Sequence, residues 1–287
     1  MPLGEMKTYL TSRKRKPVMK PPAFIVCKYS VSELTVSGEL CYVVEPRREK
    51  KGAVLFLHGG GLIMEAHIGH WLVVSKIVAR TGKAVWFVHY PLLPECSVTD
   101  MNMVVLSAYR RMIERYPASA ISIIGDSAGA AIAMGVLKFI RGYRPDIPVP
   151  ARLVLVSPGE LMIDEEKHPE IVREMREIDP RDVILNVGLI GTLNALRIET
   201  SVHDEEDTLS DQLFEGDFTG FPPTAVFVGT NEIFYPLARE ILVPSMRAAG
   251  VDVDFIVGQD MCHEWPYIPF VPESARALNQ VMEILRR

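Results

Sequence analysis

The sequence predicts an α/β fold, a mostly parallel sheet flanked by helices, and two repeating patterns support this. Short apolar runs rich in β-branched and aromatic residues recur at 54–57, 85–88, 121–124, 153–156, 224–228 and 253–257. Runs that are apolar on both faces suit strands buried in a parallel sheet. Helical patterns lie between or after them, at about 66–80, 99–115, 127–141, 236–249 and 272–286. Strands that alternate with helices of this length favour a doubly wound sheet.

The ends of the expected elements carry residues that start or stop them. The helix expected over 127–141 ends at Gly142, and the next-to-last helix begins with Pro236 and ends at Gly250. Proline at the start of a helix and glycine just after its end are the usual asymmetry. Earlier in the chain, residues 33–44 alternate in polarity, which predicts an antiparallel hairpin at the edge of the sheet.

Length and composition exclude several classes of protein. The chain has 287 residues, of which 48% are hydrophobic and 23% charged, so a disordered chain is excluded for most of its length. A net charge of -5 argues against a nucleic-acid binder. Because the sequence has neither an eighteen-residue apolar run nor an apolar signal region, we expect no stable membrane insertion and no secretory signal. Four widely spaced cysteines favour reduced thiols in a cytoplasmic protein, and a homodimer is left open.

Charge divides the chain into three parts. Residues 1–28 carry seven Lys or Arg and one Glu, whereas residues 160–217 carry seventeen Asp or Glu and five Lys or Arg. The remainder is close to neutral. Residues 158–220 also interrupt the alternation of strands and helices with polar, helix-prone segments. We therefore expect a basic arm, a neutral α/β body and an acidic insertion that lies over the sheet.

The strongest chemical signal is the segment Gly125-Asp126-Ser127-Ala128-Gly129, which follows an expected strand and opens an expected helix. This is the G-x-S-x-G nucleophile elbow in its required context. The turn is so tight that residues flanking the nucleophile must be small, and the helix N-terminus adds a positive dipole end to the site. The alternative, a chance match in a structural turn, is weakened by the strand and helix on either side.

A second signal, His58-Gly59-Gly60-Gly61, directly follows the expected strand 54–57. Consecutive glycines leave backbone N–H groups free to converge on one point, as in the oxyanion hole of lipases and esterases. A glycine-rich turn or a phosphate cradle is the alternative. A Walker loop would need Lys and Ser or Thr after the glycines, but Leu62 and Ile63 follow instead.

The third signal is His263, which follows the last expected strand and so fits the order nucleophile, acid, histidine. The acid should lie in the loop after strand 224–228, where Glu232 is the only carboxylate. Glu can orient the imidazole in such a triad. The alternative for Glu232 is a solvated residue at a helix entry. Asp260 is a weaker substitute, because it lies only three residues from His263.

Other candidates are less specific. The pair His67 and His70 has a metal-ligand spacing but no third ligand nearby, so we expect no metal site there. Trp265 and Phe234 could line an acyl pocket or pack in the core. The basic run 13–16 could bind nucleic acid or a membrane surface, although a solvated arm is commoner. Cys262 adjoins His263, and adjacent side chains point apart, so no cysteine nucleophile is expected.

Taken together, these motifs resemble the hormone-sensitive lipase family of α/β-hydrolases. The segment 90–95 is similar to that family's Y-R-L-A-P-E motif, and Ser157-Pro158 is similar to its S-P-W turn. The resemblance covers about residues 40–287. The sequence departs from the family pattern with Pro91 for Arg, Gly159 for Trp and Glu232 for Asp.

The resemblance implies an α/β-hydrolase carboxylesterase that needs no cofactor and no metal. Carried over, Ser127 is the nucleophile, His263 the general base and acid and Glu232 the orienting acid. The N–H groups of the oxyanion hole would come from Gly60, Gly61 and Ala128. The implied substrates are small-molecule esters with small to medium acyl groups. An amidase or lactonase stays an alternative, as does a ligand-binding receptor, although retention of His263 argues against the receptor.

The resemblance also implies a cap made from the N-terminal segment and the insertion after the sixth strand. We expect an N-terminal basic arm over residues 1–30, which belongs to the cap, and a cap insertion over 159–220. The hydrolase core is expected in two pieces, 31–158 and 221–287.

Overall fold

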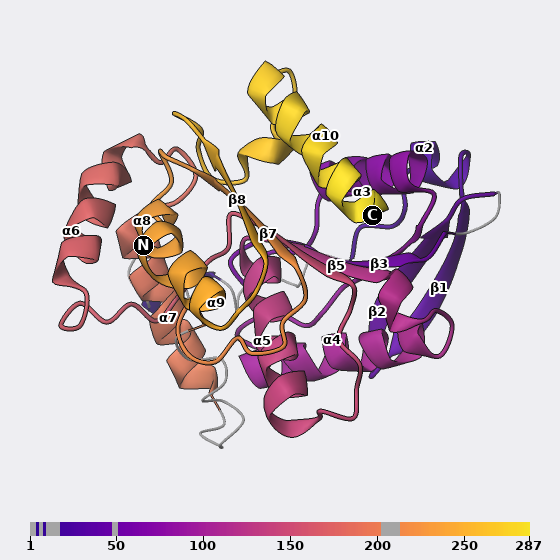
Figure 1. The fold of residues 1–287 in the computed structure, drawn as a ribbon, viewed down its shortest axis with the longest axis horizontal. Coiled ribbons are helices and arrows are strands. Elements are labelled where there is room, and N and C mark those ends of the chain that lie inside the picture. Colours follow the sequence, from indigo (N-terminus) through magenta and orange to yellow (C-terminus); the bar gives the residue numbers. More distant parts are fainter. Residues whose placement is uncertain (1–3, 6–7, 10–17, 48–50, 202–212) are drawn as a thin grey trace.

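The computed structural model describes residues 4–5, 8–9, 18–47, 51–201 and 213–287. Its centre is a twisted sheet in the order β1-β2-β4-β3-β5-β6-β7-β8 (Figure 1). All neighbouring strands are parallel except β1 with β2 and β2 with β4. The bounds are β1 (Ser30–Val36), β2 (Glu39–Glu45), β3 (Ala53–Leu57), β4 (Ala84–Val88), β5 (Ile121–Asp126), β6 (Arg152–Val156), β7 (Thr224–Gly229) and β8 (Val253–Gly258). The predicted α/β class and mostly parallel sheet are confirmed.

Burial along the strands follows their place in the sheet. Every residue of β3, β4, β5 and β7 is buried, as expected of strands that pair on both sides and are covered on both faces. The edge strand β8 is partly exposed. At the opposite edge, Ser37 and Gly38 both have positive φ, at 49° and 87°, and join β1 to β2. Two central residues with positive φ suit a tight hairpin turn, so the predicted edge hairpin is confirmed.

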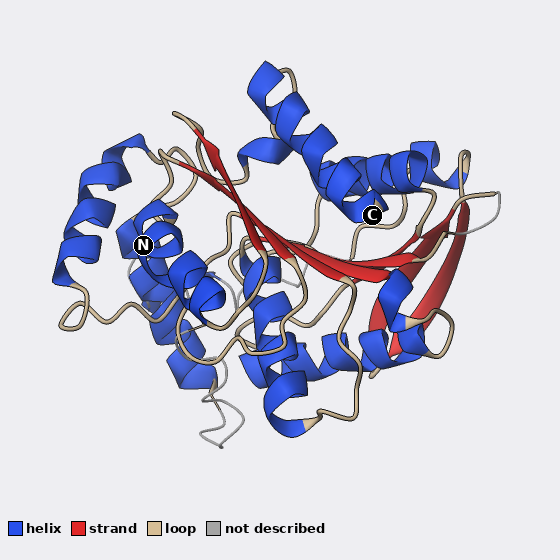
Figure 2. Cartoon of the chain, viewed as in Figure 1, coloured by secondary structure: helices blue, strands red, loops and turns tan. Residues whose placement is uncertain are grey.

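Helices cover both faces of the sheet (Figure 2). On one face, α3 and α10 pack with buried aromatic side chains of the sheet, and on the other, α4, α5 and α9 enclose the larger core. The bounds are α2 (Ala23–Val26), α3 (Ile68–Thr81), α4 (Val98–Ile113), α5 (Ala128–Tyr143), α6 (Pro169–Ile178), α7 (Val187–Thr200), α8 (Tyr235–Leu237), α9 (Val243–Ala248) and α10 (Pro272–Arg286). Among the described residues, no helix is long and apolar enough to cross a membrane.

The helix predicted over 236–249 is not regular along its length. A π-helical turn, Ala238–Leu242, separates α8 from α9. Pro244 follows this turn and has no N–H to donate, and its ring would meet the carbonyl of residue 240 in a regular α-helix. The wider turn accommodates the proline.

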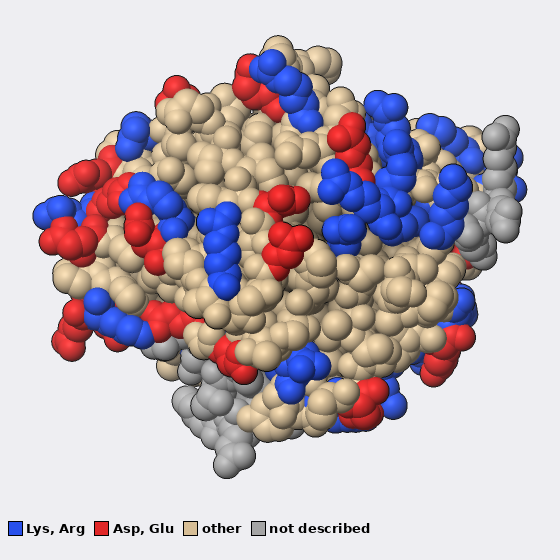
Figure 3. Space-filling model, viewed as in Figure 1, with Lys and Arg blue, Asp and Glu red and all other residues tan. Residues whose placement is uncertain are grey.

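The segment between β6 and β7 contains α6, a short 3₁₀ turn (Asp179–Arg181) and α7, with no strand among its described residues. In Figure 3, acidic and basic side chains lie side by side over α6. Several of these charges are paired, as in Arg176 with Glu165 at 2.8 Å and Arg239 with Glu174 at 2.7 Å. The predicted basic run 13–16 lies outside the described residues.

Candidate active site

Ser127 occupies the turn between β5 and α5, with φ of 49° and ψ of -117°. The strand, turn and helix expected around the G-x-S-x-G segment are therefore present. A Cβ atom at Gly125 would overlap the backbone of Gly129, and one at Gly129 would overlap the carbonyl of Leu57. The two glycines let the helix approach the strands closely, and this approach holds the serine in its strained conformation.

The structure brings Ser127, His263 and Glu232 into one hydrogen-bonded chain. Nε2 of His263 lies 2.8 Å from Oγ of Ser127, and Nδ1 lies 2.8 Å from Oε2 of Glu232. The exposed fractions are 8% for the serine, 1% for the histidine and 0% for the glutamate. Because an ionised carboxylate only accepts, Nδ1–H donates to Glu232 and leaves the Nε2 lone pair for the serine hydroxyl. This arrangement can activate the serine as a nucleophile.

The pKa values of Glu232 and His263 depend on their burial and on the contact between them. Burial raises the pKa of Glu232, opposed by its hydrogen bond to His263. Burial alone would lower the pKa of His263, but the hydrogen bond and charge of Glu232 outweigh it and the pKa of His263 is raised. Glu232 therefore favours the imidazolium form that a general base must pass through.

Glu232 is fixed on the loop after β7 by its neighbours. Its Oε1 accepts a hydrogen bond from Gly229 N at 2.7 Å. The next residue, Ile233, donates its N–H to Oδ2 of Asp182 at 3.0 Å. Asp182 belongs to the insertion, where its Oδ1 also accepts from Ile184 N and Leu185 N. The buried carboxylate of Asp182 thus joins the insertion to the loop that carries Glu232.

Asp182 could not be singled out from the sequence, because nothing local distinguishes it from the many other acids of the insertion. The weaker acid candidate, Asp260, does not approach the imidazole. Its carboxylate contacts Gln259 at 3.2 Å, and its N–H donates to Thr230. The structure therefore brings Glu232, and not Asp260, to His263.

The glycine turn after β3 is tied to the nucleophile elbow. Gly59 donates its N–H to Oδ2 of Asp126 at 2.6 Å, and His70 lies 3.3 Å from the same oxygen. Gly60 and Gly61 have positive φ, at 126° and 60°, which favours glycine. Both glycines line a cavity together with Ser127, so the turn lies beside this serine.

A second acid adjoins this turn, namely the partly buried Glu264, the residue after His263. A Cβ atom at Gly59 would overlap both Glu264 Oε1 and Asp126 Oδ2, so the two carboxyl groups crowd the same glycine. Burial, and then the charge of Asp126, raise the pKa of Glu264 to about 7. Glu264 could not be singled out from the sequence, because its proximity to Asp126 depends on the folded loops.

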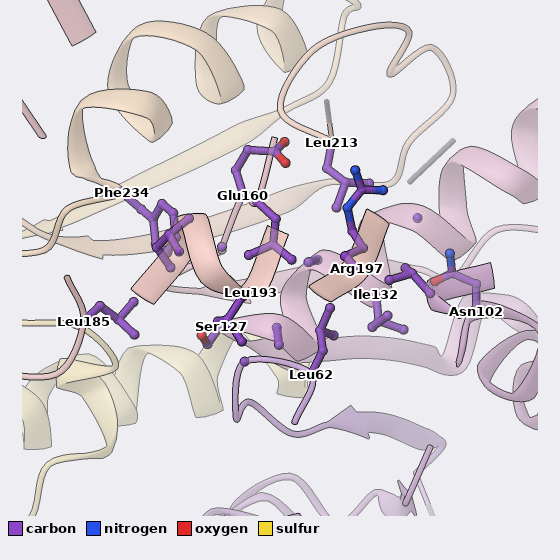
Figure 4. Close-up of a pocket in the computed structure, with 18 residues that line it drawn as sticks. Leu62, Asn102, Ser127, Ile132, Glu160, Leu185, Leu193, Arg197, Leu213 and Phe234 are labelled. Atoms are coloured by element: carbon purple, nitrogen blue, oxygen red, sulfur yellow. The ribbon is translucent and has the colours of Figure 1, made fainter. Parts of the chain in front are cut away.

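Two cavities meet at Ser127. The smaller has a volume of about 50 Å³ and a chiefly apolar lining (Figure 4). Its lining includes Leu62, Ile132, Leu193 and Phe234, with the polar side chains of Asn102 and Arg197. The larger is an open chamber of about 680 Å³, and His263 lines this chamber.

The chamber also brings distant segments together. Tyr9 and Met19 come from the N-terminal arm, and Ile184 and Leu185 come from the insertion. All four residues line the same chamber, above the catalytic candidates. The arm and the insertion therefore both border the site, as a shared cap would.

The other residues considered from the sequence lie outside the hydrogen-bonded chain of Ser127, His263 and Glu232. His67 accepts from Gly69 N at the start of α3, and its own N–H donates to His70 at 3.0 Å, so the pair caps the helix. Trp265 is buried in the core, whereas Phe234 lines the smaller cavity. Burial raises the pKa of the Cys262 thiol, which disfavours the reactive thiolate.

Comparison with known proteins identifies the fold family and several relatives. Residues 54–267 match the family described as alpha/beta hydrolase fold. An acetyl-hydrolase of Streptomyces hygroscopicus is 30% identical over 250 residues, which cover 85% of this chain and 78% of that protein. The esterase LipU of Mycobacterium tuberculosis is 26% identical over 274 residues, which cover 92% of this chain and 88% of that protein. A solved esterase from the bacterial hormone-sensitive lipase family has a TM-score of 0.78 at 27% identity, over 98% of this chain and 88% of that one.

Proposed function

Because this chain belongs to the α/β-hydrolase fold family, with relatives named esterases, we propose that it is a serine carboxylesterase. The observation that carries the proposal is the continuous chain of contacts from Ser127 through His263 to Glu232, with both distances at 2.8 Å. A receptor that only binds its ligand would not need this chain of contacts.

The reaction follows the geometry of the three side chains. Oγ of Ser127 attacks the ester carbonyl carbon while Nε2 of His263 takes its proton. Collapse of the tetrahedral intermediate breaks the bond to the alcohol, which leaves with the proton from His263. Water then attacks the acyl-enzyme by the same route and releases the acid. Glu232 holds the imidazole in the required tautomer throughout.

We assign the oxyanion hole to the N–H groups of Gly60, Gly61 and Ala128. Two observations support this: Gly60 and Gly61 border the chamber beside Ser127, and Ala128 is the first residue of α5. Loss of one such donor typically costs about 3 kcal/mol of transition-state stabilisation. Asp126 supports the hole indirectly, because it holds the N–H of Gly59 and thereby the glycine turn.

The two cavities divide the substrate into its two parts. The leaving alcohol takes its proton from His263, so it should lie in the chamber that His263 lines. The acyl group then occupies the smaller cavity of about 50 Å³. A cavity of about 150 Å³ holds benzene, so one a third of that size suits acyl groups of a few carbons. Small acyl groups are therefore favoured over medium ones.

The cap, the compartment and the oligomeric state belong to the same proposal. We assign the cap to the arm 1–30 and the insertion 159–220, because residues of both line the chamber. The core then comprises 31–158 and 221–287. None of the four cysteines, all of which lie among the described residues, forms a disulfide, which supports the reducing cytoplasm as the location. A homodimer stays open as a prediction.

Turnover of p-nitrophenyl acetate tests the activity. The wild-type enzyme should hydrolyse it, and Ser127→Ala should abolish turnover, whereas Ser32→Ala, at an exposed position on β1, should not. A matched anilide of the same acid separates an esterase from an amidase. Equal turnover of ester and anilide would argue for the amidase, and no turnover of either by folded wild-type protein would refute the proposal.

Two isomeric esters test the assignment of the cavities. Hexyl acetate and ethyl hexanoate have the same formula and similar polarity, but their long chains lie on opposite sides of the ester. We expect a higher kcat/KM for hexyl acetate, because its acyl group fits the small cavity. Faster hydrolysis of ethyl hexanoate would reverse the assignment without touching the esterase proposal.

A further inference from the structure

A cluster of three metal-ligand side chains lies behind the glycine turn, outside the catalytic chain. His58 follows β3, Glu65 lies in the loop after the glycines and His89 follows β4. One ligand atom from each side chain lies within 4.8 Å of the others. Both histidines are fully buried, and the Glu65 side chain is only 8% exposed. Two imidazoles and a carboxylate thus converge away from bulk water.

The hydrogen bonds of His58 leave one of its ring nitrogens with an unused lone pair. Its Nδ1 lies 2.7 Å from the carbonyl oxygen of Gly59, which can only accept, so Nδ1 carries the proton. Its Nε2 is then an acceptor, and this buried atom has no hydrogen-bond partner among the described residues. The ring stacks on Tyr90, whose hydroxyl donates to the His58 carbonyl. Histidines that bind metals are commonly held in this way, with the other ring N–H donated to a backbone carbonyl.

The other two groups are held on different segments. The ring of His89 packs against Tyr42 and Phe87, with ring centroids 5.6 Å and 4.6 Å away. Its Nδ1 lies 4.0 Å from Oε2 of Glu65. The His89 ring is therefore positioned by aromatic packing, while Glu65 also lines the open chamber and gives the cluster a route to solvent.

We propose that His58, Glu65 and His89 bind one divalent transition-metal ion of the zinc type. Two imidazoles and a carboxylate are ligands that zinc accepts, whereas Mg²⁺ and Ca²⁺ prefer oxygen ligands alone. Bonds of about 2.0–2.1 Å in a tetrahedral site place ligand atoms about 3.4 Å apart. Ligand atoms up to 4.8 Å apart would need to approach one another by up to about 1.4 Å, and water would supply the fourth ligand.

A bound ion would join the two ends of the glycine turn. His58 precedes the three glycines and Glu65 follows them, so both ends would be attached to His89 on the neighbouring strand end. The expected effect is a restraint on the turn. The cluster is separate from the triad, and ion binding can be measured whether or not the chain hydrolyses esters.

Cobalt titration of chelator-treated wild-type protein is the test, since Co²⁺ absorbs visible light when bound to nitrogen ligands and replaces zinc in such sites. We expect one Co²⁺ per chain, displaced by Zn²⁺, and a Tm that rises as Zn²⁺ is added. Mg²⁺ should produce neither effect. Absence of a saturable Co²⁺ signal, or a Tm indifferent to Zn²⁺, would overturn the proposal in favour of a proton shared by His89 and Glu65.

Variants locate the ion. Glu65→Gln and His89→Phe should each weaken Co²⁺ affinity by at least about tenfold. Replacing a residue that only hydrogen-bonds to a metal ligand usually costs about tenfold in affinity, so loss of a ligand itself should cost no less. The control is His168→Phe, which removes a histidine paired with Glu215 on the insertion and should leave affinity unchanged. If His89→Phe does not fold, Glu65→Gln carries the test, because this side chain borders the chamber. Unchanged affinity in Glu65→Gln, or loss of binding in His168→Phe, would place the ion elsewhere and refute the assignment.

Discussion

Replacement of Glu232 by Gln tests the proposed triad at its most unusual member. The change keeps the volume of a fully buried side chain but removes its charge. The amide can also present an N–H to Nδ1 of His263, and this contact favours the tautomer with the proton on Nε2. That tautomer cannot accept the proton of Ser127. We therefore expect kcat to fall with KM little changed.

The magnitude follows from the contact distance. Oε2 of Glu232 lies 2.8 Å from Nδ1 of His263, which separates the charge centres of carboxylate and imidazolium by about 4 Å. At an effective dielectric constant of about 20, their attraction is about 4 kcal/mol. Loss of this attraction slows the reaction by about 10³. The matching Asp→Asn change in serine proteases costs about 10⁴, so we expect roughly 10² to 10⁴.

Steady-state hydrolysis of p-nitrophenyl acetate measures the effect, with circular dichroism to show that the variant is folded. Glu232→Asp keeps the charge but shortens the reach by about 1.5 Å, beyond hydrogen-bond distance unless the loop adjusts, so its loss should be milder. Asp260→Asn and Asp254→Asn are controls that remove exposed carboxylates and should stay within about tenfold of wild type. A folded Glu232→Gln enzyme with near wild-type kcat would remove Glu232 from the triad.

Three further outcomes are expected. Glu264, with its pKa raised to about 7 from 4.5, binds its proton more tightly in the folded state, so the free energy of unfolding should fall as pH rises from about 4.5 to 7. Denaturant titrations should show that Glu264→Gln removes up to about 3 kcal/mol of that fall. The charge of Asp182 raises the pKa of His263. Asp182→Asn should therefore move the acidic limb of the pH profile of kcat/KM to lower pH, and a shift to higher pH would contradict this. Leu193→Ala should enlarge the small cavity and raise the ratio of kcat/KM for ethyl hexanoate to that for hexyl acetate by about tenfold. An unchanged ratio would show that Leu193 does not limit the size of the acyl group.

Local patterns were sufficient for the sheet and for the position of the proposed nucleophile. The buried strands are recognisable because they are short and apolar on both faces, and this property belongs to each segment by itself. Ser127 could be placed for the same reason, because its strand, turn and helix are contiguous and the flanking Gly125 and Gly129 are required by the turn. His263 followed from its order in the chain after the last strand. The π-helical turn before Pro244 was not anticipated, because the helical pattern continues through it.

Tertiary structure decided which side chains meet. Glu232 and His263 are 31 residues apart, and only the loops after β7 and β8 determine that their side chains lie 2.8 Å apart. Asp182 reaches Ile233 from the insertion, and Glu264 adjoins Asp126, through contacts that no local spacing encodes. Periodicity records which face of a segment avoids water, because burial acts on each segment alone. Contacts between buried polar groups instead depend on the positions of two or more loops at once, and these positions exist only when the chain has folded.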